Sequence, residues 1–243
     1  MFIDRKMELD LLDQRYRSNQ AELFVLYGRR RVGKTELLRA FCADKPHVFF
    51  IATLSSDSEQ LATFSQQVYG FTHTDVPSGF TFPSWEAALR ALGELPMQPK
   101  PVIVLDEFTY LISGNKAIPS ILQKVWDETL KNSQIMIVLC GSYIGMMETE
   151  VLGYQAPLYG RRTASTLLRP MDLASSALFF PGYSAEEKFI TWAVVGGMPY
   201  YLRTFQDNQD VYTNIRQHIL DAQSGTLFNE PRLLLMEELR EPR

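Results

Sequence analysis

An eight-residue segment with the pattern G-x-x-x-x-G-K-T constrains this chain more than any other part of its sequence. It runs from Gly28 to Thr35, between a short apolar run at residues 23–27 and a helical pattern that stops before Pro46. Glycine lets the backbone turn without a Cβ in the way, so several N–H groups can face one anion. The helix that starts at Lys34 directs its N-terminal dipole toward the same place. The segment therefore predicts a phosphate-binding loop between a buried strand and a helix.

The positions of this loop have separate roles toward a nucleotide. Lys34 supplies a positive charge for the β- and γ-phosphates, and the hydroxyl of Thr35 completes the coordination of Mg²⁺. The three arginines between the glycines are either solvated loop side chains or include one that screens phosphate charge. The candidate nucleotide-binding residues of the loop and the helix start are Gly28, Arg29, Arg30, Arg31, Val32, Gly33, Lys34, Thr35 and Glu36.

The charge balance limits the partners of the chain. The sequence has 24 basic and 28 acidic side chains, which gives a net charge of −4 at pH 7. Nucleic acids select for a strongly positive surface, because their phosphates dominate the binding energy. The balance therefore disfavours nucleic acid as the main partner, although a local basic patch, a homo-oligomer and a protein partner all stay open.

The cysteines and histidines do not suggest a metal site. Cys42 and Cys140 lie far apart in apolar surroundings, so we expect two buried, reduced thiols. His47, His73 and His218 show no ligand spacing. Metal bound directly by His or Cys is not expected.

The sequence also lacks the features of a membrane or export segment. It has no window of about 18 uncharged apolar residues, the length that spans a bilayer. Residues 1–6 lack the apolar stretch and small-residue cleavage site of a signal peptide. We expect a cytoplasmic location and no membrane partner.

Apolar runs and helical patterns alternate along the first two thirds of the chain. Runs typical of strands buried on both faces occur at residues 23–27, 48–52, 102–105, 135–140 and 163–168. Helical patterns occur at residues 6–18, 34–45, 61–68, 84–92 and 118–126. This alternation predicts parallel crossovers and a three-layer α/β fold. After Pro170 only helical periodicities remain, so we predict a P-loop core at residues 1–170 and a small helical domain at 171–243.

Two carboxylates follow the apolar run at 102–105. A P-loop fold needs an acid near the magnesium ion, and Asp106 fits that role. Glu107 can polarise a water for in-line attack on the γ-phosphate. Acids also occur where a strand simply meets solvent, but a phosphate-binding loop upstream favours the functional interpretation.

The same pair distinguishes between reaction classes. A small-molecule kinase uses a substrate hydroxyl and has less need of a water-activating Glu at this place. GTPases carry an N-K-x-D motif, and the one candidate, Asn115-Lys116-Ala117-Ile118, lacks the Asp and does not follow a strand. The sequence therefore favours ATP over GTP.

Further catalytic candidates follow the fourth and precede the fifth predicted strand. Ser142 can contact the γ-phosphate or the attacking water, or it can cap the next helix. An arginine at Arg161 or Arg162 can stabilise transition-state charge, in cis or from a neighbouring subunit, or both can be solvated. The sequence does not choose between the two arginines.

Together these residues resemble the archaeal-type ATPase family, which is related to the signal-transduction ATPases of the wider AAA+ group. The opening residues 2–9 are similar to the family's F-x-x-R-E-x-E-L box, with Lys6 in place of the usual acid. The other segments that carry the resemblance are residues 27–35, 104–108, 140–142, 196–202 and 227–231.

The resemblance implies a strand order of 5-1-4-3-2, followed by a helical lid. It implies that the turn at Gly197–Pro199 lies near the nucleotide, which makes Pro199 a binding candidate, and that Phe2 and Ile3 pack near the adenine. Family members usually continue into a winged-helix domain and a further C-terminal domain. The sequence up to Arg243 does not include them, so it corresponds either to a truncated form or to a short member.

Three functions fit these features. The leading hypothesis is a Mg-dependent ATPase whose turnover is slow or controlled by a partner. The second is a signalling switch that responds to ADP and ATP with little turnover. The third is a DNA-associated ATPase of the AAA+ type, which the acidic charge balance disfavours.

Overall fold

The computed structural model describes residues 2–239 and contains two compact units. The larger unit comprises residues 5–30 and 34–168. The smaller unit comprises residues 2–4, the segment Arg31–Gly33 and residues 169–239 of the described chain. The sequence-based division at residue 170 stays a prediction.

The larger unit is built around a five-stranded parallel sheet. Its strands are β1 (Glu22–Tyr27), β2 (His47–Ile51), β3 (Val102–Asp106), β4 (Met136–Gly141) and β5 (Ala164–Leu167). Their spatial order is β2-β3-β4-β1-β5, and each neighbouring pair is parallel. This confirms the predicted α/β fold class and the order 5-1-4-3-2.

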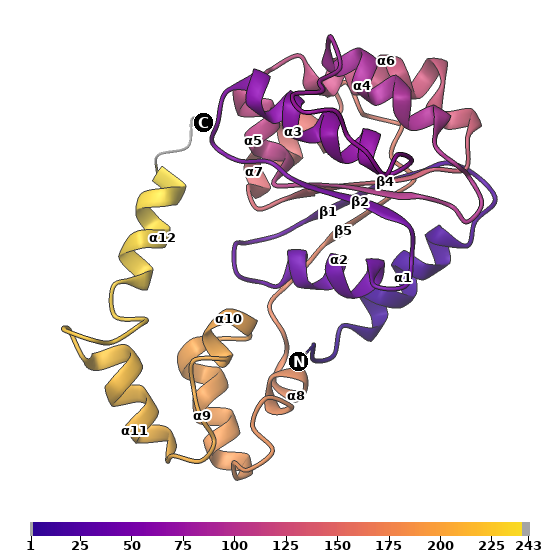
Figure 1. Cartoon of the computed structure of the whole chain (residues 1–243). Coiled ribbons are helices and arrows are strands. Elements are labelled where there is room, and N and C mark those ends of the chain that lie inside the picture. Colours follow the sequence, from indigo (N-terminus) through magenta and orange to yellow (C-terminus); the bar gives the residue numbers. More distant parts are fainter. Residues whose placement is uncertain (1, 240–243) are drawn as a thin grey trace. The chain divides into compact units, whose positions relative to one another are not determined.

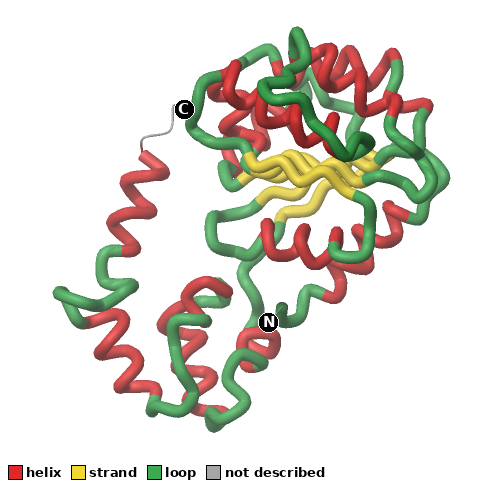
Figure 2. The backbone as a smooth tube through the Cα atoms, in the orientation of Figure 1, coloured by secondary structure: helices red, strands yellow, loops and turns green. Residues whose placement is uncertain are grey.

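Helices cover both faces of this sheet (Figures 1 and 2). One face carries α1 (Lys6–Tyr16) and α2 (Lys34–Cys42), and the other carries α3 to α7. The elements of the second group are α3 (Asp57–Gly70), α4 (Trp85–Ala91), η1 (Leu92–Glu94), α5 (Phe108–Gly114), α6 (Ile118–Glu128), η2 (Leu130–Asn132), α7 (Ile144–Met146) and the π-helix η3 (Met147–Leu152). The three layers explain why the central strands β3 and β4 are buried along their whole length.

Local signals place several of these helices. Ser84 is the N-cap of α4, and its side chain accepts a hydrogen bond from the backbone N–H of Ala87. Ser56 and Glu59 form a capping box at the start of α3. These caps satisfy backbone donors that the first helical turn leaves unpaired.

Within its described residues, the smaller unit is helical and has no strand. Its elements are α8 (Leu173–Ala177), α9 (Ala185–Val195), α10 (Pro199–Leu202), α11 (Val211–Ile215), the π-helix η4 (Arg216–Leu220) and α12 (Glu230–Leu239). Its core includes Phe180, Tyr183, Leu202, Phe205 and Val211. Over the described part of the chain, no helix has the length and apolar character to cross a membrane.

The topology of the sheet brings the chemically important segments together. β1, β3 and β4 are parallel neighbours, so their carboxyl ends meet at one edge of the sheet. Gly28 follows β1 and Ser142 follows β4, while Asp106 is the last residue of β3 and Glu107 comes directly after it. This edge is where parallel α/β sheets hold their ligands.

Candidate nucleotide-binding site

The loop between β1 and α2 is a tightly curved backbone segment. Gly28 and Gly33 have positive φ angles of 155° and 96°, and the non-glycine Arg31 also has a positive φ of 67°. A Cβ at Gly28 would lie only 2.4 Å from the carbonyl oxygen of Leu168, so this position admits glycine alone. The curvature is what a row of inward-facing N–H groups around an anion requires.

Lys34 is the first residue of α2, and its side chain folds back over the loop. Its ammonium donates hydrogen bonds to the carbonyl oxygens of Gly28 at 2.9 Å and Arg29 at 3.0 Å. The residue is only 5% exposed. Burial lowers the pKa of Lys34, while the nearby carboxylates of Glu107 and Asp106 act in the opposite direction. Polyphosphate oxygens would be stronger partners for this ammonium than the two carbonyls that it contacts here.

Thr35 and Asp106 meet beside this lysine. The hydroxyl of Thr35 donates a hydrogen bond of 2.7 Å to Oδ2 of Asp106, across 71 positions of sequence. The other carboxylate oxygen of Asp106 accepts from the backbone N–H of Glu107 at 2.9 Å. Asp106 is 1% exposed, so these contacts orient its carboxylate.

This donor set fits magnesium. Mg²⁺ prefers hard oxygen ligands, and proteins usually hold it with one or two side chains together with substrate phosphates and water. The hydroxyl of Thr35 and the carboxylate of Asp106 supply such oxygens at hydrogen-bond distance from one another. Among the side chains that the structure describes, no three His, Cys, Asp or Glu residues form a metal-binding group, and a nucleotide-dependent Mg²⁺ site does not need one.

Glu107 occupies a left-handed backbone conformation at the start of α5, with φ 51° and ψ 43°. Such a conformation is uncommon for a non-glycine residue and often marks a functional position. Its Oε1 atom accepts a hydrogen bond of 2.6 Å from the hydroxyl of Ser142. The N-cap of the following helix α7 is Tyr143, so capping of that helix is not the observed role of Ser142.

The arginines of the loop have different surroundings. Arg29 is exposed, and Arg30 donates a hydrogen bond to the hydroxyl of Tyr110 on α5. Within the smaller unit, Arg31 forms an ion pair with Glu230 at the start of α12 and lies 4.6 Å from the ring centroid of Tyr200. Arg30 and Arg31 therefore both have specific side-chain partners, which the sequence did not indicate.

Glu230 is also tied to α10. Its Oε1 atom accepts a hydrogen bond of 2.9 Å from the hydroxyl of Tyr201, and the residue is 7% exposed. Glu230 falls in one of the segments that carry the family resemblance, but no spacing rule predicted its partner. Residue-specific co-variation would be the signal that could find such a pair.

The remaining nucleotide-binding candidates differ in burial and in location. Val32 is completely buried, which gives its side chain a packing role. Glu36 is exposed in the first turn of α2. Pro199 is the first residue of α10, and a Cβ at Gly33 would lie 3.7 Å from its Cγ atom, so the Gly197–Pro199 turn approaches the loop within the smaller unit.

The two arginine candidates before β5 differ in how they are held. Arg161 contacts both carboxylate oxygens of Asp127, with the shortest distance 2.8 Å, and also donates to the carbonyls of Pro157 and Tyr159. Arg162 donates to one carbonyl, that of Leu152, at 2.8 Å. Arg161 is thus fixed in a bidentate ion pair of its own unit.

The fold and these side chains define a P-loop nucleotide-binding protein. A family model described as an ATPase domain predominantly from Archaea matches residues 2–205. The chain belongs to this family, as the sequence resemblance predicted.

Relatives and solved structures agree with this assignment. The uncharacterized protein MJECL04 of Methanocaldococcus jannaschii is 32% identical over 202 residues, which are 83% of this chain and 43% of that protein. The uncharacterized ATP-binding protein MJ0423 of the same organism is 51% identical over 45 residues, or 18% of this chain and 76% of its own length. The chain thus spans less than half the length of MJECL04.

The similar solved structures share the fold. The Walker-type ATPase PABY2304 of Pyrococcus abyssi has a TM-score of 0.70 at 21% identity, covering 98% of this chain and 76% of its own. The Orc1 protein of Aeropyrum pernix, solved in complex with DNA, has a TM-score of 0.59 at 15% identity, covering 96% and 62%. At these identities the likeness concerns the fold and carries no DNA-binding function to this chain.

Proposed function

We propose that this chain binds ATP with Mg²⁺ and hydrolyses it to ADP and phosphate, with slow or partner-regulated turnover. The observation that supports this most is the hydrogen bond between Thr35 and Asp106, because it joins the P-loop helix to the acidic strand end at the place where a magnesium ion would bind. Family membership supports the same activity.

In this proposal each side chain has one task. Lys34 exchanges its two loop carbonyls for the β- and γ-phosphate oxygens, while Thr35 and Asp106 hold the magnesium ion. The bound Mg²⁺ would neutralise charge on the phosphate oxygens. Glu107 accepts a hydrogen bond from the attacking water and receives its proton as the water oxygen bonds to the γ-phosphorus, while the bond from that phosphorus to the β–γ bridging oxygen breaks and ADP leaves.

Two further residues support the reaction. Ser142 holds the carboxylate of Glu107 through its 2.6 Å hydrogen bond and so limits the directions from which a water can be activated. Arg162 is the better candidate for the charge-stabilising arginine, because Arg161 is already committed to Asp127. A neighbouring subunit or partner that presents such an arginine would make turnover dependent on assembly.

Thermal unfolding with and without Mg-ATP tests nucleotide binding. Ligand at about 100 times its dissociation constant adds roughly 2.7 kcal/mol to the free energy of unfolding. We expect this shift in the wild type and its loss in Lys34→Ala, while Lys131→Ala, at an exposed position in η2, retains it. An unshifted wild type would contradict the proposal.

Phosphate release tests the chemical step separately. We expect Glu107→Gln to bind Mg-ATP as well as the wild type and to release phosphate at least about 100-fold more slowly, the scale of general-base catalysis. If the wild type releases phosphate no faster than Glu107→Gln, the proposed catalysis is contradicted and only nucleotide binding is supported.

A second candidate function is a nucleotide-gated switch with little turnover. The contacts of Arg31 favour it, because a residue of the phosphate-binding loop is ion-paired with Glu230 of the C-terminal helix inside one unit. A change in the loop on nucleotide exchange would then alter that pair. The switch would be supported over the ATPase by two results together. Purified protein retains tightly bound ADP, and the Glu230→Gln variant releases that ADP faster than the Glu148→Gln control.

A further inference from the structure

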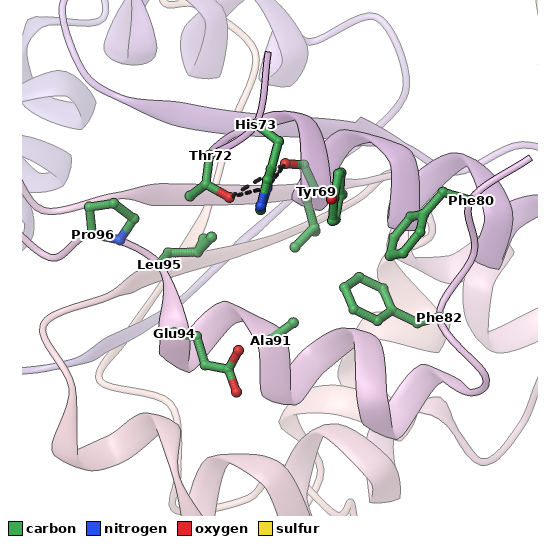
Figure 3. Close-up of a pocket in the computed structure, with 10 residues that line it drawn as sticks. Tyr69, Thr72, His73, Phe80, Phe82, Ala91, Glu94, Leu95 and Pro96 are labelled. Atoms are coloured by element: carbon green, nitrogen blue, oxygen red, sulfur yellow. Dashed lines mark hydrogen bonds between the residues drawn. The ribbon is translucent and has the colours of Figure 1, made fainter. Parts of the chain in front are cut away.

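The larger unit contains a cavity that shares no lining residue with the nucleotide-binding site. Its volume is about 510 Å³, within the range of about 300–1,000 Å³ that is usual for small-molecule sites. Its lining residues come from the C-terminal part of α3, the loop at residues 71–83, and the segment around η1 (Figure 3). None of the site residues discussed above belongs to it.

Four rings form a continuous aromatic wall along this cavity. His73 stacks on Tyr69 with ring centroids 3.9 Å apart and an interplanar angle of 8°. Tyr69 in turn packs on Phe80 at 4.4 Å, and Phe80 meets Phe82 edge to face at 5.1 Å and 79°. These contacts hold the rings in place in the absence of a ligand. Binding therefore loses little free energy to the ordering of these side chains.

Hydrogen bonds fix the ring of His73 at one end of the wall. Its Nδ1 atom lies 3.0 Å from the carbonyl oxygen of Tyr69 and 2.9 Å from the hydroxyl of Thr72. Figure 3 shows these contacts beside the cavity. The ring of His73 is thus oriented by residues at the end of α3 and directly after it, and not by a catalytic partner.

The charge of the lining is one-sided. Glu94, the last residue of η1, contributes an exposed carboxylate, and the ten described lining residues include no lysine or arginine. Aromatic faces carry a negative quadrupole and attract cations. The rings and the carboxylate therefore favour the same ligand charge.

We propose that this cavity is a binding site for a small organic monocation with a planar or apolar body, such as an amidinium, guanidinium or alkylammonium compound. Three rings of the aromatic wall, those of Tyr69, Phe80 and Phe82, contact the apolar body in this proposal, and Glu94 pairs with the cationic group. A neutral compound of the same shape keeps the apolar contacts and loses the ion pair and the cation–π attraction.

Benzamidine and its neutral isostere benzamide test this site in the chain of residues 1–243. We expect benzamidine, titrated in amide-detected NMR, to shift the signals of Thr72, His73 and Glu94, and to bind about tenfold more tightly than benzamide. Equal affinities of the two compounds, or benzamidine shifts confined to residues outside the cavity, would overturn the proposal.

Two variants separate the charge from the aromatic wall. Glu94→Gln should reduce the preference for benzamidine over benzamide from about tenfold to about threefold, the part that the aromatic rings supply, while Glu148→Gln, at an exposed position in η3, should preserve the full preference. Phe80→Leu should weaken benzamidine binding about threefold without removing the preference. Circular dichroism establishes that each variant is folded, and a Glu94→Gln protein that keeps the full preference would contradict the role of the carboxylate.

Discussion

The hydroxyl of Ser142 donates a 2.6 Å hydrogen bond to Oε1 of Glu107, joining the ends of two adjacent strands. The backbone of Glu107 also has an unusual left-handed conformation, with a φ angle of 51°. A general base is effective only when its carboxylate is aimed at the proton that it removes. The pair therefore gives Ser142 a positioning role under the proposed hydrolysis.

Removal of this hydroxyl should slow turnover without weakening nucleotide binding. We expect Ser142→Ala to reduce the rate of phosphate release about tenfold, a part of the whole general-base effect. Since the serine acts through Glu107, the double variant with Glu107→Gln should be no slower than Glu107→Gln alone. Ser113→Ala is the control, because its hydroxyl donates to the carbonyl of Thr109 within α5. Additive losses in the double variant would show that Ser142 acts independently of Glu107.

The close approach of Gly28 to Leu168 makes a second prediction. A methyl group on Gly28 would meet the Leu168 carbonyl oxygen at 2.4 Å, and the backbone of Leu168 is tied to β1 because its N–H donates to the carbonyl of Tyr27 at 2.7 Å. We expect Gly28→Ala to lower the free energy of unfolding by about 2–3 kcal/mol in urea titrations, and to lose the Mg-ATP shift.

Gly160→Ala is the matched control for this change. Gly160 also has a positive φ, 75°, but a Cβ there would meet no atom within 4 Å. Only the cost of the left-handed backbone remains, about 1 kcal/mol. Equal losses in the two variants would mean that the contact with Leu168 relaxes easily.

Much of this architecture is predictable because its signals are local. The strands of a parallel sheet are buried on both faces and so read as apolar runs, and all five predicted runs overlap observed strands. The loop from Gly28 to Thr35 is similarly local, since its turn chemistry depends on residues within one segment. The strand order followed from the family resemblance and not from these patterns.

The side-chain partners lack such signals. Arg31 and Glu230 are far apart in sequence, and no periodicity links an arginine to one acid among many. For Ser142 the residues alone left two alternatives, a helix cap or a contact near the γ-phosphate, and the position of Glu107 across the strand ends decided its observed partner. The π-helical turns η3 and η4 were also missed, because an i→i+5 turn has no sequence period of its own.

Substitutions of the two arginines before β5 should have different effects, on turnover for Arg162 and on stability for Arg161. Arg162→Ala should reduce turnover by a factor on the order of 10³ if it supplies transition-state charge, with the free energy of unfolding unchanged. Arg161→Ala should lower the free energy of unfolding by up to about 1 kcal/mol, because its ion pair with Asp127 is partly exposed. Steady-state phosphate release and urea unfolding on both variants check this, and the reverse pattern would assign the role to Arg161.

Cys42 should make the stability of the fold depend on pH in the alkaline range. Burial raises the pKa of this thiol from 9.0 to about 12, and the residue is 1% exposed. In the unfolded chain the thiol ionises above pH 9, whereas in the folded chain it stays protonated, so the unfolded state loses protons first. The stability contributed by the thiol is complete below pH 9 and is lost as the pH rises toward 12.

Between pH 8 and pH 10 this effect amounts to a loss of about 1.4 kcal/mol in the free energy of unfolding. Urea unfolding under reducing conditions measures the free energy of unfolding at pH 8 and pH 10. We expect the decrease over this interval to be about 1.4 kcal/mol larger in the wild type than in Cys42→Ala. Burial also raises the pKa of the Cys140 thiol well above its ordinary value, but that residue is present in both proteins and cancels in the comparison. If the wild type and Cys42→Ala lose the same stability over this interval, the thiol of Cys42 is accessible to water in the folded state, and its side chain cannot be part of the packed face of α2.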